Sequence, residues 1–99
     1  MPRPQENISG FSSFKQDFPA ALKEIAGHRN VPKNVKAIMQ SLASDAAQST
    51  FTQIPTKRTI ENKLQGIQSF QQVPFEAQVQ SIYYMKLAWN ASFSSAFDK

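Results

Sequence analysis

An apolar residue followed directly by proline occurs four times in this 99-residue chain, each time before a stretch with helical periodicity. The pairs are Phe18-Pro19, Val31-Pro32, Ile54-Pro55 and Val73-Pro74. Proline is tolerated in the first turn of a helix, where its missing N–H has no intrahelical partner, and the apolar residue before it packs back on the first turns. The pattern predicts four helices, at residues 18–27, 32–48, 55–71 and 74–97. No segment alternates apolar and polar residues over the length of a strand, so we predict no sheet.

Four short helices in a chain of this length favour a small four-helix bundle. A chain of about 100 residues buries roughly 60–68% of its unfolded surface, which is enough for a core without disulfides. Four helices are too few for an extended superhelix, so an up-and-down bundle is the simpler arrangement. We therefore predict an all-α fold, with residues 9–99 as one helical domain. Residues 1–8 hold two prolines and little apolar content, which predicts a flexible N-terminal arm.

The last predicted helix carries more apolar surface than any other segment. Its large apolar side chains recur at intervals of three, four and seven residues, at Phe75, Val79, Ile82, Trp89, Phe93 and Phe97. Such intervals place side chains on one face of a helix, so we predict that this face forms the spine of the core. By the same rule, the inner stripes of the second and third helices are Val31, Val35, Ile38, Leu42 and Ala46, and Ile60, Leu64 and Ile67.

Three phenylalanines near the N-terminus, Phe11, Phe14 and Phe18, are spaced as one helical face requires. Pro19 interrupts that face, so either one helix kinks there or a short turn at residues 10–16 precedes a helix that starts near Phe18. We favour the second alternative. The segment before Phe18 is rich in Ser and Gly, which are weak helix formers, and it must dock on another element to be stable. We predict that residues 10–17 pack on the far end of the last helix.

The chain is also rich in aromatic residues, with eight Phe, two Tyr and one Trp. We expect most of these rings in the core. The adjacent Tyr83 and Tyr84 cannot both face one helical stripe, however, and Phe93 and Phe97 extend past the surface that three short helices can cover. Apolar side chains left exposed usually mark a partner site. The candidate interface residues are Phe11, Phe14, Tyr83, Tyr84, Phe93 and Phe97.

The residues that most enzymes and metal sites require are largely missing. The chain has no Cys, which excludes disulfides, thiolate zinc sites and Cys nucleophiles. His28 is the only His and has no motif partner, and the glycine-rich phosphate loop, the nucleophile elbow and the His-x-x-x-His pair are absent. Asp45 and Glu61 are candidates for paired carboxylates, with separate solvated acids as the simpler interpretation. We predict a non-enzymatic protein without a cofactor or metal.

The hydropathy pattern gives no sign of a membrane protein. No apolar run approaches the roughly 18 residues of a membrane span. No apolar block follows the first six residues, as it would in a secretory signal. These features predict a cytoplasmic protein that does not associate with a membrane.

The formal net charge of +4 permits an anionic partner without requiring one. Basic residues gather at the starts of the second and third predicted helices, at Arg29, Lys33, Lys36, Lys57 and Arg58. Free N–H groups at a helix start, together with lysines, are typical of an anion site, and RNA phosphate fits one. In an up-and-down bundle the two helix starts lie at opposite ends, which argues against one large nucleic-acid face. Solvated side chains without a ligand are the simpler interpretation.

Three stretches carry a family resemblance. They are Glu24-Ile25-Ala26 with Val31-Pro32-Lys33-Asn34-Val35-Lys36, the spacing of Leu64, Ile67 and Pro74, and Pro74-Phe75-Glu76-Ala77 with Ile82-Tyr83. Over about residues 22–89 the chain resembles the archaeal uncharacterised protein family zero-one-four-seven. Gly27-His28-Arg29-Asn30 departs from it, because family members tend to be acidic there. The resemblance implies a small bromodomain-like, up-and-down four-helix bundle, and it implies no activity because the family has none established.

Two functions are consistent with these features. The first is a non-enzymatic helical interaction module that docks on a larger protein or ribonucleoprotein, or associates with itself. The alternative is an RNA-binding or ribosome-associated accessory protein that uses its basic helix N-termini. No small-molecule substrate is evident in the sequence.

Overall fold

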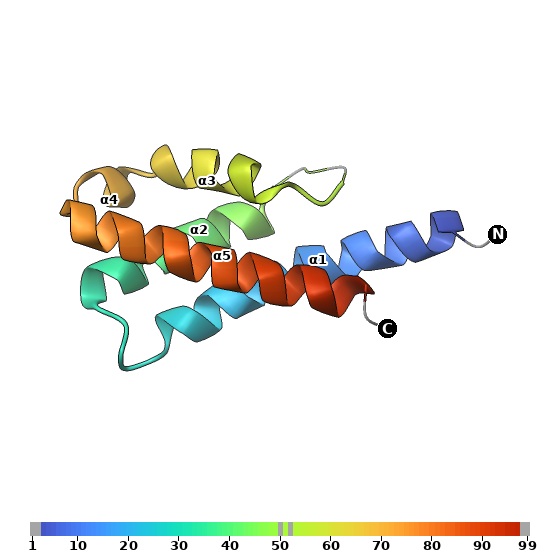
Figure 1. The fold of residues 1–99 in the computed structure, drawn as a ribbon, viewed down its shortest axis with the longest axis horizontal. Helices are drawn as coiled ribbons and strands as arrows, with labels where there is room; N and C mark the ends of the chain where they lie inside the picture. Colours follow the sequence, from blue (N-terminus) through green and yellow to red (C-terminus); the bar gives the residue numbers. More distant parts are fainter. Residues whose placement is uncertain (1–2, 50, 52, 98–99) are drawn as a thin grey trace.

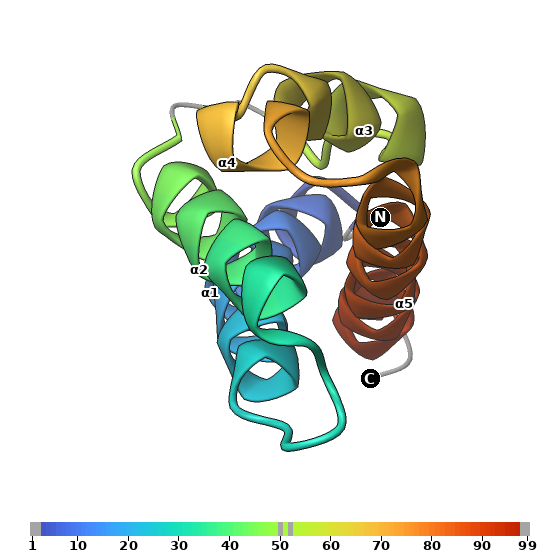
Figure 2. The same ribbon diagram turned by 90° about the vertical axis from the view of Figure 1, so that its left-hand side faces the viewer.

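The computed structural model of the chain describes residues 3–49, 51 and 53–97, with the backbone alone at residues 3–9 and 97. In this described part the fold is all-α, as predicted, without strands. The helices are α1 (Arg3–Ala26), α2 (Lys33–Ala47), α3 (Lys57–Gln65), α4 (Gln68–Gln71) and α5 (Phe75–Phe97). α1 and α5 are the longest, and the N-terminal turns of α1 extend past the other helices (Figure 1). Seen end-on, α3 and α4 lie across one side of the molecule, with α2 and α5 on either side below them (Figure 2).

α1 passes through Pro19 without interruption. It also includes residues 3–8, the segment predicted as an N-terminal arm. The predicted start of the first helix near Phe18 is therefore wrong. Proline lacks the N–H that bonds the carbonyl four residues back, which weakens a helix interior. The helix continues because Phe14, Phe18 and Leu22 are buried on both sides of the proline. Tertiary packing on these turns outweighs the missing hydrogen bond.

The third predicted helix, at residues 55–71, is two helices in the structure, because α3 ends at Gly66 and α4 begins after Ile67. Ile67 is extended, with φ −78° and ψ 128°. The Gln71 Nε2 donates to the carbonyl of Gln65, the last residue of α3, at 3.0 Å. Glycine is a weak helix former, so ending α3 at Gly66 costs little free energy. The turn brings Phe70 into the core.

The second and third predicted stripes do form the core. Val31, Val35, Ile38, Leu42, Ala46, Ile60 and Leu64 are all buried. Ile67 is half-buried against the same cluster. The helical periodicity of these segments was sufficient to identify their buried residues, because each segment has one apolar face and one polar face.

α5 buries a different face from the one predicted. Its buried residues are Ala77, Ser81, Met85, Ala88 and Ser92. Phe75 and Val79 are exposed, so the predicted core spine is wrong at these positions, and Trp89 is only half-buried. α5 packs mainly on α1, and small inward side chains allow the two helix backbones to approach closely. Phe75 and Val79 are consequently turned outward, whereas Met85 is buried and Trp89 is half-buried against the core.

A row of aromatic rings joins α1 to the C-terminal half of α5. Phe14 stacks on Phe18 with ring centroids 5.3 Å apart, and it meets the Trp89 ring edge-on at 6.1 Å. Trp89 stacks in turn on Phe93 at 4.7 Å. Phe14, within the segment predicted to pack around Phe93 and Phe97, therefore contacts α5 at Trp89, one turn before Phe93.

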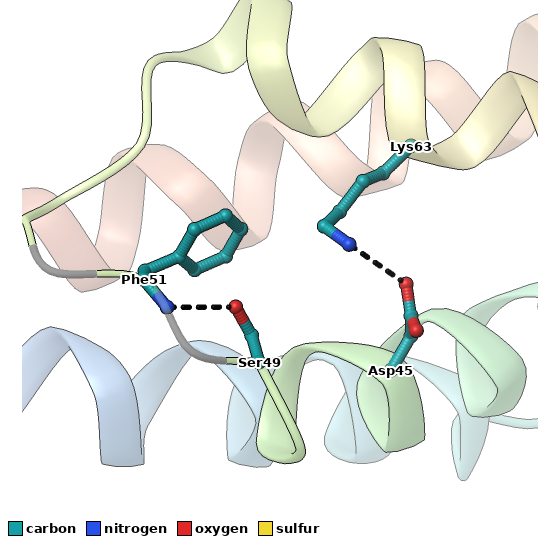
Figure 3. A network of polar contacts seen from close by, with 4 residues as sticks. All are labelled: Asp45, Ser49, Phe51 and Lys63. Atoms are coloured by element: carbon teal, nitrogen blue, oxygen red, sulfur yellow. Dashed lines mark hydrogen bonds and ion pairs between the residues drawn. The ribbon is translucent and has the colours of Figure 1, made fainter.

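Polar contacts fix the loop that precedes α3 (Figure 3). The backbone N–H of Phe51 donates to the Ser49 Oγ at 3.2 Å. The Lys63 Nζ lies 3.4 Å from the Asp45 Oδ2 and 5.6 Å from the centroid of the Phe51 ring. Lys63 therefore connects α3 both to α2 and to the loop.

Candidate protein-interaction surface

Four large apolar side chains form an exposed row along α5. Phe75 is 79% exposed, Val79 48%, Tyr83 59% and Leu87 43%. They are four residues apart, so they follow one ridge of the helix surface. We call these four residues the α5 row. In the described part of the chain, the other large hydrophobic residue with an exposed side chain is Phe93, at 39%, and it also belongs to α5.

The α5 row exists because the opposite side of the helix is the buried one. Val79 and Tyr83 lie two residues before and after Ser81, which is fully buried, and a displacement of two residues turns a side chain to the far side of a helix. The Ser81 Oγ donates to the Ala77 carbonyl at 2.8 Å, so its hydroxyl is satisfied within the helix. The row is therefore a surface feature that the fold cannot bury by itself.

Charged side chains border the α5 row at both ends. Glu76 follows Phe75 in the first turn of α5, and Lys86 precedes Leu87. The Lys86 Nζ lies 3.7 Å from the Glu61 Oε1 of α3, and both side chains are substantially exposed. An exposed ion pair of this kind contributes little to stability and leaves Lys86 able to meet a second anion.

The predicted interface residues have mixed placements. Tyr83 belongs to the α5 row, and Tyr84 is half-buried with its ring 5.5 Å from that of Tyr83. Phe11 is half-buried near Pro55, and Phe14, at 2% exposure, is a core residue, so its assignment to the interface is wrong. Phe93 is partly exposed against Trp89. The side chain of Phe97 lies outside the described part of the structure.

Sequence reasoning missed three members of the α5 row. Phe75 and Val79 were assigned to the core, and Leu87 was not singled out. The available signal was the second stripe of the same helix, in which small residues and Met85 recur at intervals of three and four. When two stripes compete, the larger side chains do not necessarily point inward, because close helix packing favours small ones.

The predicted basic residues fall into two groups, one at the start of α2 and one at the start of α3, and these two helix starts lie at different places (Figure 1). Arg29 and Lys33 are exposed where α2 begins, and Lys36 is half-buried one turn later. Lys57 and Arg58 open α3 and, with Lys86, line an open hollow of about 490 Å³. The structure therefore does not bring all five predicted basic residues together. Lys86, which the sequence did not suggest, joins the second group.

Lys57 is already engaged within the molecule. Its Nζ lies 5.3 Å from the centroid of the Trp89 ring. The indole Nε1 of Trp89 donates to the Pro55 carbonyl at 2.8 Å. Both contacts hold the start of α3 against α5, so a structural role accounts for this lysine.

The candidate acidic residues Asp45 and Glu61 and the single histidine lie at separate places in the described structure. Asp45 and Glu61 each contact a different lysine, Lys63 and Lys86, rather than each other. His28 is exposed, beside an open hollow of about 280 Å³ that Glu24 also lines. Across the residues whose placement is described, no three His, Cys, Asp or Glu side chains come close enough to share a metal ion. Over the same residues, every helix is too short or too polar to traverse a bilayer.

Comparisons with known proteins returned no match for this chain, whether against protein-family models, curated proteins or solved structures. The assignment of a function therefore rests on the α5 row and the charges around it.

Proposed function

We propose that this chain is a non-enzymatic helical module that binds a protein through the outward face of α5. The observation that carries the proposal is the α5 row, Phe75, Val79, Tyr83 and Leu87, which leaves four large apolar side chains in water on one helix. Contiguous apolar surface of this kind is typical of sites that another protein covers. A partner that covers this row gains apolar burial without any rearrangement of the core.

The neighbourhood of the α5 row supports a binding face. An interface commonly has an apolar centre and a polar rim, with aromatic residues enriched at the centre. Here Phe75 and Tyr83 supply aromatic surface, and Glu76 and Lys86 supply a charged rim. The Trp89 contacts secure the same helix to the loop before α3, so the face is presented on a fixed element.

We also propose that the helices form an up-and-down, bromodomain-like four-helix bundle in which α3 and α4 together replace the third helix. The support is that this pair buries Ile60 and Leu64, two of the inward residues of the predicted helix, together with Phe70, despite the break at Gly66. The resemblance to the archaeal family points to the same arrangement.

Site-specific photocrosslinking tests the proposed function. A benzoylphenylalanine placed at Val79 lies in the α5 row, and the same residue placed at Gln40 lies on the exposed side of α2 as a matched control. In a lysate of the source cells, we expect a discrete protein adduct from position 79 and none from position 40. Adducts of equal yield from both positions, or none from either, would refute a binding role for this face.

RNA binding is the second candidate function, and the hollow lined by Lys57, Arg58 and Lys86 is the observation that favours it. Asn62 and Gln65 add amide groups to the same hollow. The carboxylate of Glu61 also lies there and pairs with Lys86, which lowers the positive charge available to phosphate. We therefore rank RNA binding below protein binding.

Charge-reversal variants test RNA binding separately from the proposed protein binding. Lys57→Glu with Arg58→Glu should weaken binding of a fluorescent single-stranded RNA at least about tenfold and should flatten its salt dependence, because phosphate contacts release counterions. Lys33→Glu with Lys36→Glu makes the same charge change at the start of α2 and serves as the control. RNA affinity that is equal in both variants would exclude the α3 hollow as the RNA site.

A further inference from the structure

We infer that the partner of the α5 face is a second copy of this chain, with the two α5 helices packed antiparallel. The inference rests on the proposed function, since it names the occupant of the same face. It is drawn from the symmetry of the exposed residues about one position of α5, and from the signs of the charges at either end.

The outward face of α5 has the spacing of a helix–helix seam. Glu76, Val79, Tyr83 and Lys86 follow one another at intervals of three, four and three residues, and all four are exposed. This spacing keeps side chains on the line of contact when two helices pack at a small angle. Phe75 and Leu87 flank the seam and widen its apolar surface.

The seam is symmetric about the level of Ser81. Val79 and Tyr83 lie two residues on either side of that level, and Glu76 and Lys86 lie five residues on either side. An antiparallel pair centred there places each Val79 at the level of the second copy's Tyr83. Two-fold symmetry repeats this contact, so the same patch serves both copies, as an isologous interface requires.

The charges select the antiparallel orientation. In that orientation each Glu76 meets the second copy's Lys86, so both ends of the seam gain an opposite-charge pair. In a parallel pair, Glu76 would face Glu76 and Lys86 would face Lys86, and like charges in contact oppose association. The intramolecular partner of Lys86, Glu61, lies 3.7 Å away in an exposed and therefore weak ion pair. Lys86 can consequently contact both carboxylates.

The exposed area indicates a reversible dimer rather than a permanent one. The α5 row exposes apolar surface on the order of 400 Å² per copy, which lies at the low end of specific interfaces even after the charged rim is added. Area alone does not fix affinity, but a small interface with few aromatic anchors lies at the weak end of the range, so we expect a Kd in the micromolar range. We therefore expect monomer at low micromolar concentration and dimer well above it.

Sedimentation equilibrium of the full chain between about 5 and 500 μM tests the inference, because mass action populates the dimer across this range. We expect a monomer–dimer equilibrium that Glu76→Lys or Lys86→Glu weakens at least about fivefold. The double variant, Glu76→Lys with Lys86→Glu, should return to within about twofold of wild type, because opposite charges meet again. Lys33→Glu carries the same charge change on α2 and should leave the Kd unchanged. Far-UV circular dichroism of each variant verifies that the helices are retained.

Cysteine crosslinking tests the orientation, and the absence of native Cys makes its result clear. An equimolar mixture of the Glu76→Cys and Lys86→Cys variants should form a mixed disulfide, whereas each variant alone should form little. Efficient crosslinking of Glu76→Cys with itself would overturn the antiparallel arrangement. A wild-type chain that stays monomeric up to about 500 μM would overturn the inference as a whole, because the predicted dimer is populated there. If the chain stays monomeric, a photocrosslinked adduct between position 79 and a different protein would still support the proposed function.

Discussion

Replacing Trp89 tests how the loop before α3 is held against α5. The indole makes two separable sets of contacts: its Nε1 donates to the carbonyl of Pro55 at 2.8 Å, and its ring packs between Phe14 and Phe93. Trp89→Phe removes the hydrogen bond and retains a ring. Trp89→Ala removes the hydrogen bond and the ring contacts together.

The two substitutions should lower the free energy of unfolding by different amounts. Pro55 is buried, so Trp89→Phe leaves its carbonyl without the indole donor, which costs about 1–2 kcal/mol of the free energy of unfolding. Trp89→Ala also loses two aromatic pairs, each of which contributes about 0.5–1.5 kcal/mol beyond its buried area. We expect a total loss of about 3 kcal/mol for Trp89→Ala, the low end for a truncated Trp because this side chain is only half-buried.

Urea denaturation followed by far-UV circular dichroism measures both losses, since the only Trp is removed and its fluorescence cannot report. Measurements at low micromolar protein keep the chain monomeric. Asn90→Ser, at the exposed position next to Trp89, is the control and should change the free energy of unfolding by less than about 0.5 kcal/mol. Wild-type stability in Trp89→Phe would refute the hydrogen-bond argument, and equal losses in both variants would refute the contribution of ring packing.

Three further substitutions follow from local geometry. Gly66→Ala should stabilise by about 0.4–1 kcal/mol in urea denaturation, because φ is −83° and an added Cβ meets the Lys63 and Asn62 carbonyl oxygens at ordinary contact distances of 3.5 and 4.0 Å; a loss would contradict this. Thr56→Ala should lower the free energy of unfolding by about 1 kcal/mol, and Thr56→Ser should change it little, because the Thr56 hydroxyl caps α3 by accepting from the Thr59 N–H at 3.2 Å. Equal losses in the two variants would refute this capping role. Ser92→Ala should raise the melting temperature by about 4–8 °C, because the Ser92 Oγ is buried with no hydrogen-bond partner within the described residues. A lower melting temperature would show that the hydroxyl is hydrogen-bonded.

Local sequence determined where α2 and α5 begin and which faces of α2 and α3 are buried. α2 and α5 each start directly after the proline of an apolar–proline pair, because proline suits a first turn and disfavours a preceding one. Ile38 and Leu42 of α2, and Ile60 of α3, lie on helices with one apolar face each, so the 3.6-residue period alone identified them as core. The cations at the starts of α2 and α3 were likewise placed at separate sites by the order of the helices.

Tertiary structure decided the course of α1 and the outward face of α5. The sequence around Pro19 favours a break, and the helix persists only because Phe14 and Leu22 are buried against other elements on either side of it. On α5, apolar residues occupy nearly every side, so periodicity has no single solution. Close packing on α1 selects the stripe around Ser81 and turns Val79 and Tyr83 to the surface, because the free energy of burying a side chain depends on the room its neighbours leave as well as on its size.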